Sequence, residues 1–492
     1  MNQSVMILVS IFFPIIWGMG ILIKPEFKKR GNLIAMTGAG LLVTAALSLM
    51  VMFNGDMQLE LFSLGKNMNI YFQVDNLGRM FAVVVTIVWV LAGFYAFEYM
   101  KHEQEEKRYF GFYLIVFGVL QALCFSGSML TYYLFYEMMT LLSVPLILHA
   151  KTKEAIIGGL KYLFYSLFGA YMVLFGIYFL NKYATTLNFS AGGVLDVSAL
   201  ADNKGILLVV AFAMILGFSI KAGMFPLHAW LPTAHPVAPA PASAVMSGII
   251  VKMGVLGMIR VVFYMFGADF LRGTWVQKAW LVLALITVFL GSMMAYREKM
   301  FKKRLAYSTV SQASYILFGL ALLEPQAFTG SLLHVVFHAM IKSALFMCAG
   351  VVIYKTGKTS VKDLRGIGKE MPVTIWCYTF ASLALIGIPP ASGFISKWYL
   401  AMGSLKSGIS TFSWLGPVIL LISALLTAGY LLPVTIQGFL PGADYEYDAL
   451  KKKEPVKMMV VPLVILAALA IMLGVLPNPL VSYISDIVST VL

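Results

Sequence analysis

Runs of about 20 apolar residues recur from one end of the chain to the other, and each is long enough to cross the hydrocarbon core of a bilayer as a helix. Hydrophobic residues make up 60% of the 492 positions and charged residues 12%. A soluble globular protein carries about 25% charged residues, so lipid is the solvent for most of this chain. We predict an all-α polytopic membrane protein.

The apolar runs predict fourteen membrane-spanning helices, of which the seventh and the twelfth are interrupted. They are expected at residues 4–23, 33–53, 77–97, 109–127, 129–149, 156–181, 205–223, 243–266, 274–296, 304–323, 328–354, 372–400, 414–440 and 456–486. No basic residue precedes the first run, so we expect a retained span rather than a cleaved signal peptide.

The positive charge follows the expected topology. A formal net charge of +14 would invite a nucleic-acid-binding function. However, 24 of the 36 basic residues fall in connections after odd-numbered spans or at the adjoining span edges, and only seven fall in or beside connections after even-numbered spans. The positive-inside rule then predicts that the odd-numbered connections are cytoplasmic and that both termini lie outside the cell. The charge therefore indicates orientation rather than nucleic-acid binding.

Cofactor and metal signatures are missing from the sequence. Cys124, Cys348 and Cys377 lie in or beside apolar stretches and form no CxxC pair, which is typical of small buried residues. There is no glycine-rich dinucleotide loop after a strand and no convincing haem-ligand pair. We expect no bound cofactor and no metal.

Apart from the charges assigned to connections and span edges, six charged residues fall inside the expected spans, where a charge costs about 2.5–3.5 kcal/mol on insertion scales. They are Glu137, Lys221, Lys252, Arg260, Lys342 and Lys397. The cost predicts that these side chains face the protein interior and mark an ion pathway.

Lys221 and Lys397 both lie beside prolines and glycines that interrupt a helix. The dipole of a half-helix stabilises a cation near its carboxyl end, whereas burial opposes the charge. Such a group suits a switch that responds to the charge of a neighbour. Broken spans in both halves suggest inverted repeats with functional sites at the breaks, and two unrelated kinks are the alternative.

Glu137 lies in a tyrosine-rich span, on the same helical face as Tyr133 and Thr140. A nearby lysine would keep this carboxylate ionised. Two interpretations remain open: a fixed ion pair that locks two helices, and a carboxylate whose partner controls its charge.

Lys252 lies mid-span between small residues that permit close helix packing. Arg260 follows two turns later and is interpreted as structural, with a side chain long enough to extend to the membrane interface.

His334, His338 and Lys342 recur every four residues and share one helical face. An HxxxH pair can bind zinc, but no further ligands are evident nearby. Packing histidines are the simpler alternative. We favour a polar file that relays protons, because histidine titrates near neutral pH. Ser308 and Gln312 in the neighbouring span could hold water beside it.

His228 and His235 flank the prolines of MFPLHAWLPTAHPVAPAPASA. This segment is too polar and proline-rich to meet lipid, so it must be buried or line a cavity. Either histidine could gate a water path, and a purely structural loop is the alternative.

Five sequence blocks together carry a family resemblance. They are GFSIKAGMFPLHAWLPTAHPVAPAPASAVMSGIIVKMGVLGMIR, YEMM around Glu137, AYSTVSQASY around Ser308, HVVFHAMIKSALFMCAG around Lys342 and GIPPASGFISKW around Lys397. The chain resembles the antiporter-like subunits of respiratory complex I and of Mrp-type multisubunit cation/proton antiporters over about residues 109–440. One class of complex I relative carries Glu where this chain has Lys397, and the largest subunits carry carboxyl-terminal extensions. The chain is most similar to the D subunits of Mrp antiporters.

The resemblance implies fourteen helices around two inverted five-helix repeats, each with a discontinuous helix, near Lys221 and Lys397. The expected divisions are helices 1–3 in residues 1–108, the first repeat in 109–266, the second in 274–440 and the last helix in 456–492.

The resemblance also implies roles in proton transfer. Glu137 and Lys221 would be the charge pair of the amino-terminal half, and Lys252 would connect them to the middle. His334, His338 and Lys342 would continue the polar axis, and Lys397 would be the switch of the carboxyl-terminal half.

The function so implied is proton translocation in a multisubunit Na+/H+ antiporter of a bacterial cell membrane, with other membrane subunits as partners and no enzymatic activity of its own. A proton-pumping subunit of a complex I-like NADH:quinone oxidoreductase or membrane-bound hydrogenase is the alternative. A membrane scaffold with inert ion pairs is the third hypothesis.

Overall fold

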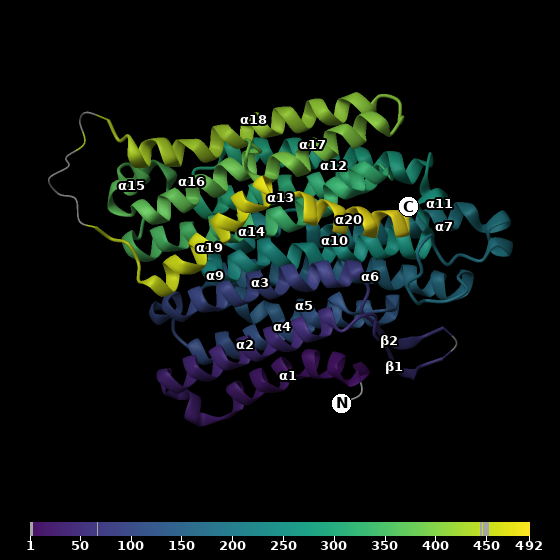
Figure 1. The fold of residues 1–492 in the computed structure, drawn as a ribbon, viewed down its shortest axis with the longest axis horizontal. Helices are drawn as coiled ribbons and strands as arrows, with labels where there is room; N and C mark the ends of the chain where they lie inside the picture. Colours follow the sequence, from purple (N-terminus) through teal and green to yellow (C-terminus); the bar gives the residue numbers. More distant parts are fainter. Residues whose placement is uncertain (1–2, 66, 443–444, 446–451) are drawn as a thin grey trace.

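In the computed structural model, which describes residues 3–65, 67–442, 445 and 452–492, the helices run side by side in one bundle (Figure 1). Within these residues, twelve helical stretches are long and apolar enough to cross a membrane, which confirms an all-α polytopic membrane protein. They are α1 (Gln3–Ile23), α2 (Arg30–Phe53), α3 (Asn76–Tyr99), α4 (Glu106–Cys124), α5 (Met129–Ile147), α6 (Lys153–Tyr183), α7 (Val197–Ala222), a continuous stretch Ala240–Phe266 that includes α9 (Ala240–Val245) and α10 (Val251–Ile259), α12 (Trp275–Arg297), α14 (Pro325–Thr356), α18 (Phe412–Phe439) and α19 (Lys457–Val475).

The other two expected spans correspond to helices that are more polar or shorter. The tenth is α13 (Phe301–Ala321), and the twelfth is the pair α16 (Pro372–Ile386) and α17 (Ser392–Lys406). The last expected span divides into two, because α19 is followed by a separate helix, α20 (Asn478–Val491). The count of fourteen stays a prediction.

Both expected helix interruptions are present. α7 ends before Gly223, which adopts a φ of +80°, and the chain resumes as α8 (Leu231–Val237). α16 ends before Gly387, which adopts a φ of +92°, and α17 follows. Glycine suits both positions because a side chain disfavours this left-handed conformation.

The first interruption is stabilised by protein groups that replace the missing helical bonds. The Trp230 indole donates a hydrogen bond of 2.8 Å to the Ile220 carbonyl near the end of α7. The Phe225 amide donates to the Thr287 hydroxyl of α12 at 2.9 Å. Non-helical backbone at this depth is tolerated only when it is satisfied in this way.

The centre of the bundle is α14, which packs against α3, α9, α13, α16, α17, α19 and α20. Its neighbour, the stretch Ala240–Phe266, is wholly buried and has π-helical turns at Met246–Ile250 and Arg260–Phe266. Such turns within α-helices are frequent at functional sites. Polar residues on these two stretches are therefore shielded from lipid.

A two-stranded antiparallel hairpin, β1 (Gln58–Ser63) and β2 (Asn69–Gln73), joins α2 to α3 and was not expected from hydropathy. The Gly127 amide donates to the Tyr71 carbonyl at 2.9 Å, so β2 lies on the turn between α4 and α5. The hairpin thus covers one end of the bundle. Two short helices, α11 (Ala268–Leu271) and α15 (Ile367–Glu370), lie in other connections.

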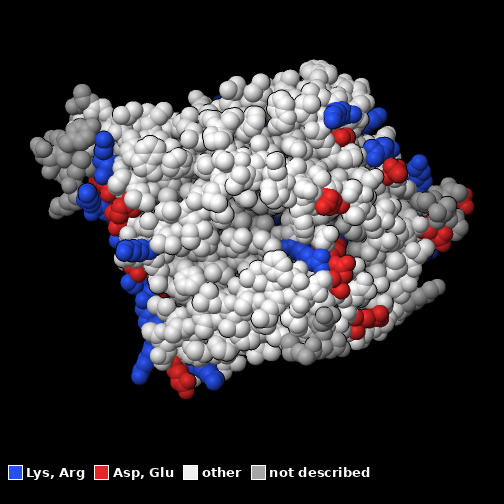
Figure 2. Space-filling model, in the orientation of Figure 1, with Lys and Arg blue, Asp and Glu red and all other residues white. Residues whose placement is uncertain are grey.

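The two ends of the bundle differ in charge. Figure 2 shows Lys and Arg gathered along the edge at the left, where α15 lies, and a mixture of both signs at the right. Both chain termini lie toward the right (Figure 1). The basic end and the termini are therefore opposite each other, and the assignment of the basic end to the cytoplasm stays a prediction.

His149 lies between α5 and α6, outside the membrane-spanning segments, and is only 3% exposed. The His149 Nε2 is 2.8 Å from the Gln104 carbonyl, and the Arg108 guanidinium donates to the backbone carbonyl of His149 at 2.6 Å. Burial, with a smaller contribution from Arg108, lowers the pKa of His149 to about 4. The native ring is therefore neutral where an unfolded histidine, with a pKa of about 6.5, is already protonated.

The protein should lose stability as the pH falls from 6.5 to about 4, because the unfolded state then binds a proton that the native His149 does not. His149→Gln removes this contribution, which is on the order of 3 kcal/mol at most. We expect thermal unfolding in detergent to depend less steeply on pH over this range, with the exposed His102→Gln as the control. Identical slopes in His149→Gln and the unaltered protein would contradict the assignment.

Candidate functional site

Lys221 is buried in the last turn of α7 and is surrounded by hydroxyl groups. Its ammonium donates to Thr140 Oγ1 of α5 at 2.9 Å, and to Tyr162 Oη at 3.1 Å and Ser166 Oγ at 2.8 Å, both of α6. It also lies 4.3 Å from the centre of the Tyr162 ring. Three hydroxyls and an aromatic face replace the water that burial removes.

Glu137 of α5 is half-buried, and one of its carboxylate oxygens is buried without a protein partner. Within the described residues no ion pair joins it to Lys221, although the two interact electrostatically. Thr140, one turn further along α5, stands where a direct carboxylate contact was expected. The expected charge pair is therefore an indirect one.

α7 and α10 approach each other closely beside Lys221. A Cβ at Gly254 would lie 2.7 Å from the Phe218 carbonyl and 2.9 Å from Lys221 Cβ, so only glycine fits. Two residues before Gly254, the buried Lys252 donates to the Ser247 carbonyl at 2.6 Å. Small residues thus bring the two lysine-bearing helices together, as expected for packing within a membrane.

Lys252 is bonded directly to the histidine file of α14. Its Nζ lies 2.5 Å from His338 Nδ1, and the His338 and His334 rings have centroids 5.7 Å apart. His334 Nδ1 lies 2.9 Å from Ser396 Oγ of α17, the residue before Lys397. The predicted alignment of the two histidines on one face is confirmed, and the file leads from the buried Lys252 to the residue that precedes the half-buried Lys397.

Lys342 lies further along the same helix and faces α13. Its ammonium donates to the Leu305 carbonyl at 2.7 Å and to Ser308 Oγ at 3.1 Å. The Tyr430 hydroxyl of α18 donates to the same Ser308 at 2.9 Å. Ser308 of the tenth expected span therefore bonds directly to Lys342, and its expected role in holding water stays a prediction.

Lys397 belongs to α17, but its ammonium reaches back across the break to the end of α16. It donates to the Leu385 carbonyl at 2.6 Å and to the Ile386 carbonyl at 2.9 Å. These are carbonyls that the end of a helix leaves unpaired, where the helix dipole favours a cation. The side chain also borders a hollow of about 290 Å³ at the bundle surface.

Several buried polar atoms along this path have no protein partner among the described residues. They are His334 Nε2, His338 Nε2, both side-chain atoms of Gln312, and Ser314 Oγ. Buried polar groups are normally bonded either to protein or to ordered water. These atoms therefore mark positions suited to water beside the histidine file.

The two proline-flanking histidines differ in their surroundings. His228 is half-buried between α7 and α8. His235 of α8 is wholly buried, stacks on Phe346 at 4.7 Å and has no protein partner on either ring nitrogen. His235 interacts electrostatically with Lys342, Lys302 and Lys252, so it lies beside the axis.

Lys302 was assigned from the sequence to a connection, but in α13 it is only 8% exposed. Its ammonium donates to the Pro236 carbonyl at 3.2 Å and to the carbonyl of Ala238, the residue that follows the end of α8. Together with Glu103 it lines a hollow of about 190 Å³ at the basic end of the bundle. Burial raises the pKa of Glu103, and Lys302 partly offsets this effect. No sequence signal distinguishes Lys302 from the basic residues around it.

Arg260 does not extend to the interface as expected, because its side chain is 2% exposed. Its guanidinium forms a two-bonded ion pair with Asp75, at 2.5 and 2.9 Å, and lies over the rings of Phe189 and Tyr264. Asp75 also caps the start of α3 by accepting from the Gly78 amide at 2.8 Å. The pair ties the π-helical segment to α3 and is structural.

The chain matches known protein families over most of its length. Residues 126–427 match the family described as NADH:quinone oxidoreductase/Mrp antiporter, transmembrane, and residues 62–110 match the amino-terminal family of complex I chain 5. The NADH-quinone oxidoreductase N subunit of Desulforudis audaxviator is 32% identical over 83% of this chain and 82% of the relative. The Na+/H+ antiporter D subunit of Alkalihalophilus pseudofirmus is 28% identical over 99% of this chain and 97% of the relative.

Solved structures share the fold. A chain of the Mrp complex from Dietzia sp. superimposes with a TM-score of 0.85 at 20% identity, over 100% of this chain and 98% of that chain. A chain of respiratory complex I from Thermus thermophilus superimposes with a TM-score of 0.79 at 20% identity, over 99% of both chains.

Asp75→Asn should destabilise the protein by about 3 kcal/mol, because it leaves the Arg260 charge buried without its partner. Asparagine retains the helix cap, so the loss reports the ion pair. The exposed Asp56→Asn is the control and should change stability by less than about 1 kcal/mol. Thermal unfolding in detergent measures both. An Asp75→Asn protein of unchanged stability would contradict the structural role of the pair.

Proposed function

Because the chain belongs to the NADH:quinone oxidoreductase/Mrp antiporter family, we propose that it is the proton-translocating subunit of a multisubunit Na+/H+ antiporter. The observation that carries the proposal is the series of basic side chains from the buried Lys221 and Lys252 to the half-buried Lys397, with His338 bonded to Lys252 and His334 bonded to Ser396, the residue before Lys397. The relatives named as D subunits of Na+/H+ antiporters support an ion-transport role over an enzymatic one.

In this mechanism a proton enters the amino-terminal half of the axis at Lys221. The three hydroxyls around its ammonium can each donate and accept, so they can pass a proton without large movement. Glu137 lies within electrostatic reach of Lys221, and a change in its charge alters the cost of the buried ammonium. Glu137 therefore acts on Lys221 through the field rather than through a bond.

The central section holds at most one excess proton, shared between Lys252 and His338. A protonated lysine and a protonated histidine both present only donors, so they cannot share a bond of 2.5 Å. At least one partner is therefore neutral. A charge arriving at Lys221 on one side or at Lys342 on the other shifts this proton, which couples the two halves.

The carboxyl-terminal half passes the proton from His334 through Ser396 toward Lys397. Lys397 borders an otherwise apolar hollow at the bundle surface, which suits transfer to a neighbouring subunit seated there. The unpartnered atoms of Gln312 and Ser314 provide water positions along this route.

Access from the basic end is assigned to the hollow beside Glu103 and Lys302. His235 is wholly buried and interacts electrostatically both with Lys302 and with the axis lysines Lys342 and Lys252. Neither of its ring nitrogens has a protein partner among the described residues, which suits a gate between the hollow and the axis. His228 is the second gating candidate, toward the α7–α8 interruption. With the basic end in the cytoplasm, this route would admit protons from inside, and both termini would lie outside.

The interruptions at Gly223 and Gly387 support a division into two inverted five-helix repeats, residues 109–266 and 274–440. Residues 1–108 and 456–492 would flank these repeats. The multisubunit complexes among the structural neighbours support other membrane subunits as partners in a cell membrane.

A proton-pumping subunit of a redox enzyme is the second candidate. It is favoured by relatives named as an N subunit of NADH-quinone oxidoreductase and as hydrogenase-4 component B, at 32% and 30% identity. The redox chemistry would then belong to partner proteins. Neighbouring genes for iron–sulfur and flavin subunits would support this candidate, whereas genes for small membrane subunits alone would support the antiporter.

Lys221→Ala should abolish sodium-dependent dissipation of a pH gradient in everted membrane vesicles that contain the assembled complex. We expect the exchange rate to fall at least about a hundredfold, as for the loss of a positioned proton-transfer group. Lys182→Ala, which removes an exposed lysine at the end of α6, is the matched control. Complex assembly is measured in the same membranes by immunoblotting.

The scaffold hypothesis predicts the opposite result. Glu137→Gln and Lys397→Ala would then leave exchange intact and lower only assembly. Full exchange in an assembled Lys221→Ala complex would refute the proposed function.

A further inference from the structure

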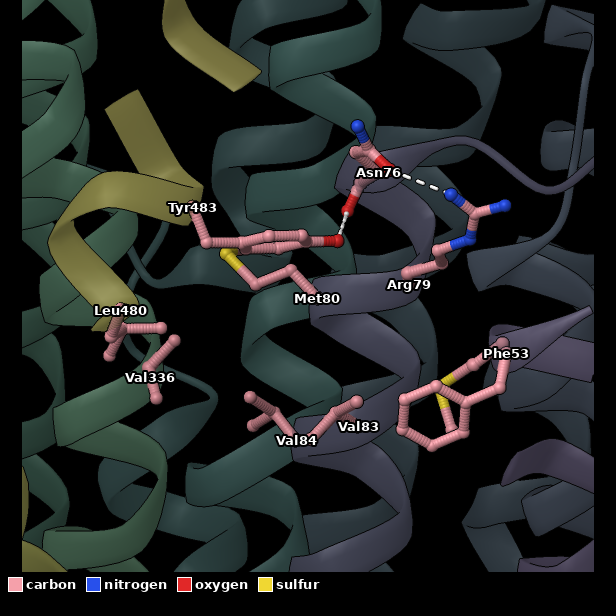
Figure 3. Close-up of a pocket in the computed structure, with 10 residues that line it drawn as sticks. Phe53, Asn76, Arg79, Met80, Val83, Val84, Val336, Leu480 and Tyr483 are labelled. Carbon is pink, nitrogen blue, oxygen red and sulfur yellow. Dashed lines mark hydrogen bonds between the residues drawn. The ribbon is translucent and has the colours of Figure 1, made fainter. Parts of the chain in front are cut away.

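A groove outside the polar axis opens at the surface of the bundle between α2, α3, α14 and α20 (Figure 3). Its volume is about 420 Å³, within the range of ligand sites. Its apolar wall includes Val83 and Val84 of α3, Val336 of α14 and Leu480 of α20. Phe53 stands at its side and is 82% exposed, so the groove opens toward the membrane rather than toward the core.

Polar groups are confined to one end of this groove, where Figure 3 shows Asn76, Arg79 and Tyr483 together. Arg79 donates to Asn76 Oδ1 at 2.7 Å and to Asp56 Oδ1 at 2.8 Å, while its Nε is buried without a protein partner. The Asp56 side chain is 84% exposed. Arg79 at the end of the apolar channel is therefore paired with an accessible carboxylate, Asp56, which borders the neighbouring hollow.

We propose that this groove binds phosphatidylethanolamine, with an acyl chain along the valines, the phosphate at Arg79 and the ammonium at Asp56. Arg79 lies in the first turn of α3, at the end of a membrane-crossing helix, which is the depth of lipid headgroups. Arginine forms strong charge-assisted hydrogen bonds with phosphate.

The paired charges select the headgroup. An anionic headgroup such as phosphatidylglycerol would bring its phosphate beside the Asp56 carboxylate without offering a cation in return. A choline group offers no N–H donor, whereas the ethanolamine ammonium can donate to Asp56. The site is therefore complementary to a zwitterionic lipid with a primary ammonium.

The acyl chain would lie against the back of the helix that carries the polar axis. Val336 of the groove wall lies between His334 and His338 in α14. A bound chain fills this side of α14 with hydrocarbon and keeps water on the side of the histidines.

The test uses the complete membrane assembly, purified in mild detergent and incubated with equal amounts of dioleoyl phosphatidylethanolamine and dioleoyl phosphatidylglycerol. Native mass spectrometry counts the lipids retained on this chain. Arg79→Gln should lower phosphatidylethanolamine retention about tenfold, the effect of one lost charge-assisted hydrogen bond. Arg272→Gln, which removes an arginine with a comparable exposed aspartate partner away from the groove, should leave retention unchanged.

Val83→Trp fills the channel and should also lower retention while Arg79 remains, which keeps the test valid if Arg79→Gln assembles poorly. If Arg79→Gln and Val83→Trp both retained as much phosphatidylethanolamine as the unaltered protein, the proposal would be overturned. Preferential retention of phosphatidylglycerol, or cross-linking of a Leu480→Cys variant to a partner subunit seated in the groove, would also overturn it.

Discussion

The structure depends on keeping the Lys221 ammonium stable in a bundle that lipid surrounds. A lysine at this depth is tolerated only if protein groups replace its water. Those groups come from α5 and α6, and they reach Lys221 because α6 and α7 pack almost backbone to backbone. A Cβ at Gly169 would lie 2.5 Å from the Gly217 carbonyl. The close packing of α6 against α7 is therefore required for the hydroxyl groups to reach Lys221.

Backbone carbonyls also stabilise the other lysines along the axis. Lys252 donates to Ser247 within a π-helical turn, Lys302 to Ala238 between α8 and α9, and Lys397 to the last carbonyls of α16. Breaks and π turns free such carbonyls from helical bonds, whereas Lys342 makes an additional bond to the Leu305 carbonyl within α13. The irregular backbone at the centre of this protein thus supplies acceptors for the charges that a membrane would otherwise reject.

Hydropathy and charge parity predicted the helical class, the two interruptions and the six intramembrane charges, because lipid imposes the same rules on every span. The sequence did not predict which residues far apart in the chain contact each other. Arg260 pairs with Asp75 across 185 positions, and Thr140 takes the place next to Lys221 that Glu137 was expected to fill. The burial of Lys302 was not predicted, because it depends on which of several adjacent basic residues turns inward. The hairpin β1–β2 was missed, although the alternating polar and apolar residues of its two strands were a readable signal.

The two interruptions differ in what holds them together. At the first, a neutral indole, Trp230, is bonded to the end of α7, and the Lys221 ammonium is free of that junction. At the second, the Lys397 ammonium itself links α17 to the last carbonyls of α16. Loss of a proton from Lys221 therefore alters the local field but leaves its hinge intact. Loss of a proton from Lys397 would weaken the hydrogen bonds that hold α17 to the end of α16. A change of protonation at the second break would therefore also change how firmly the two half-helices are held together.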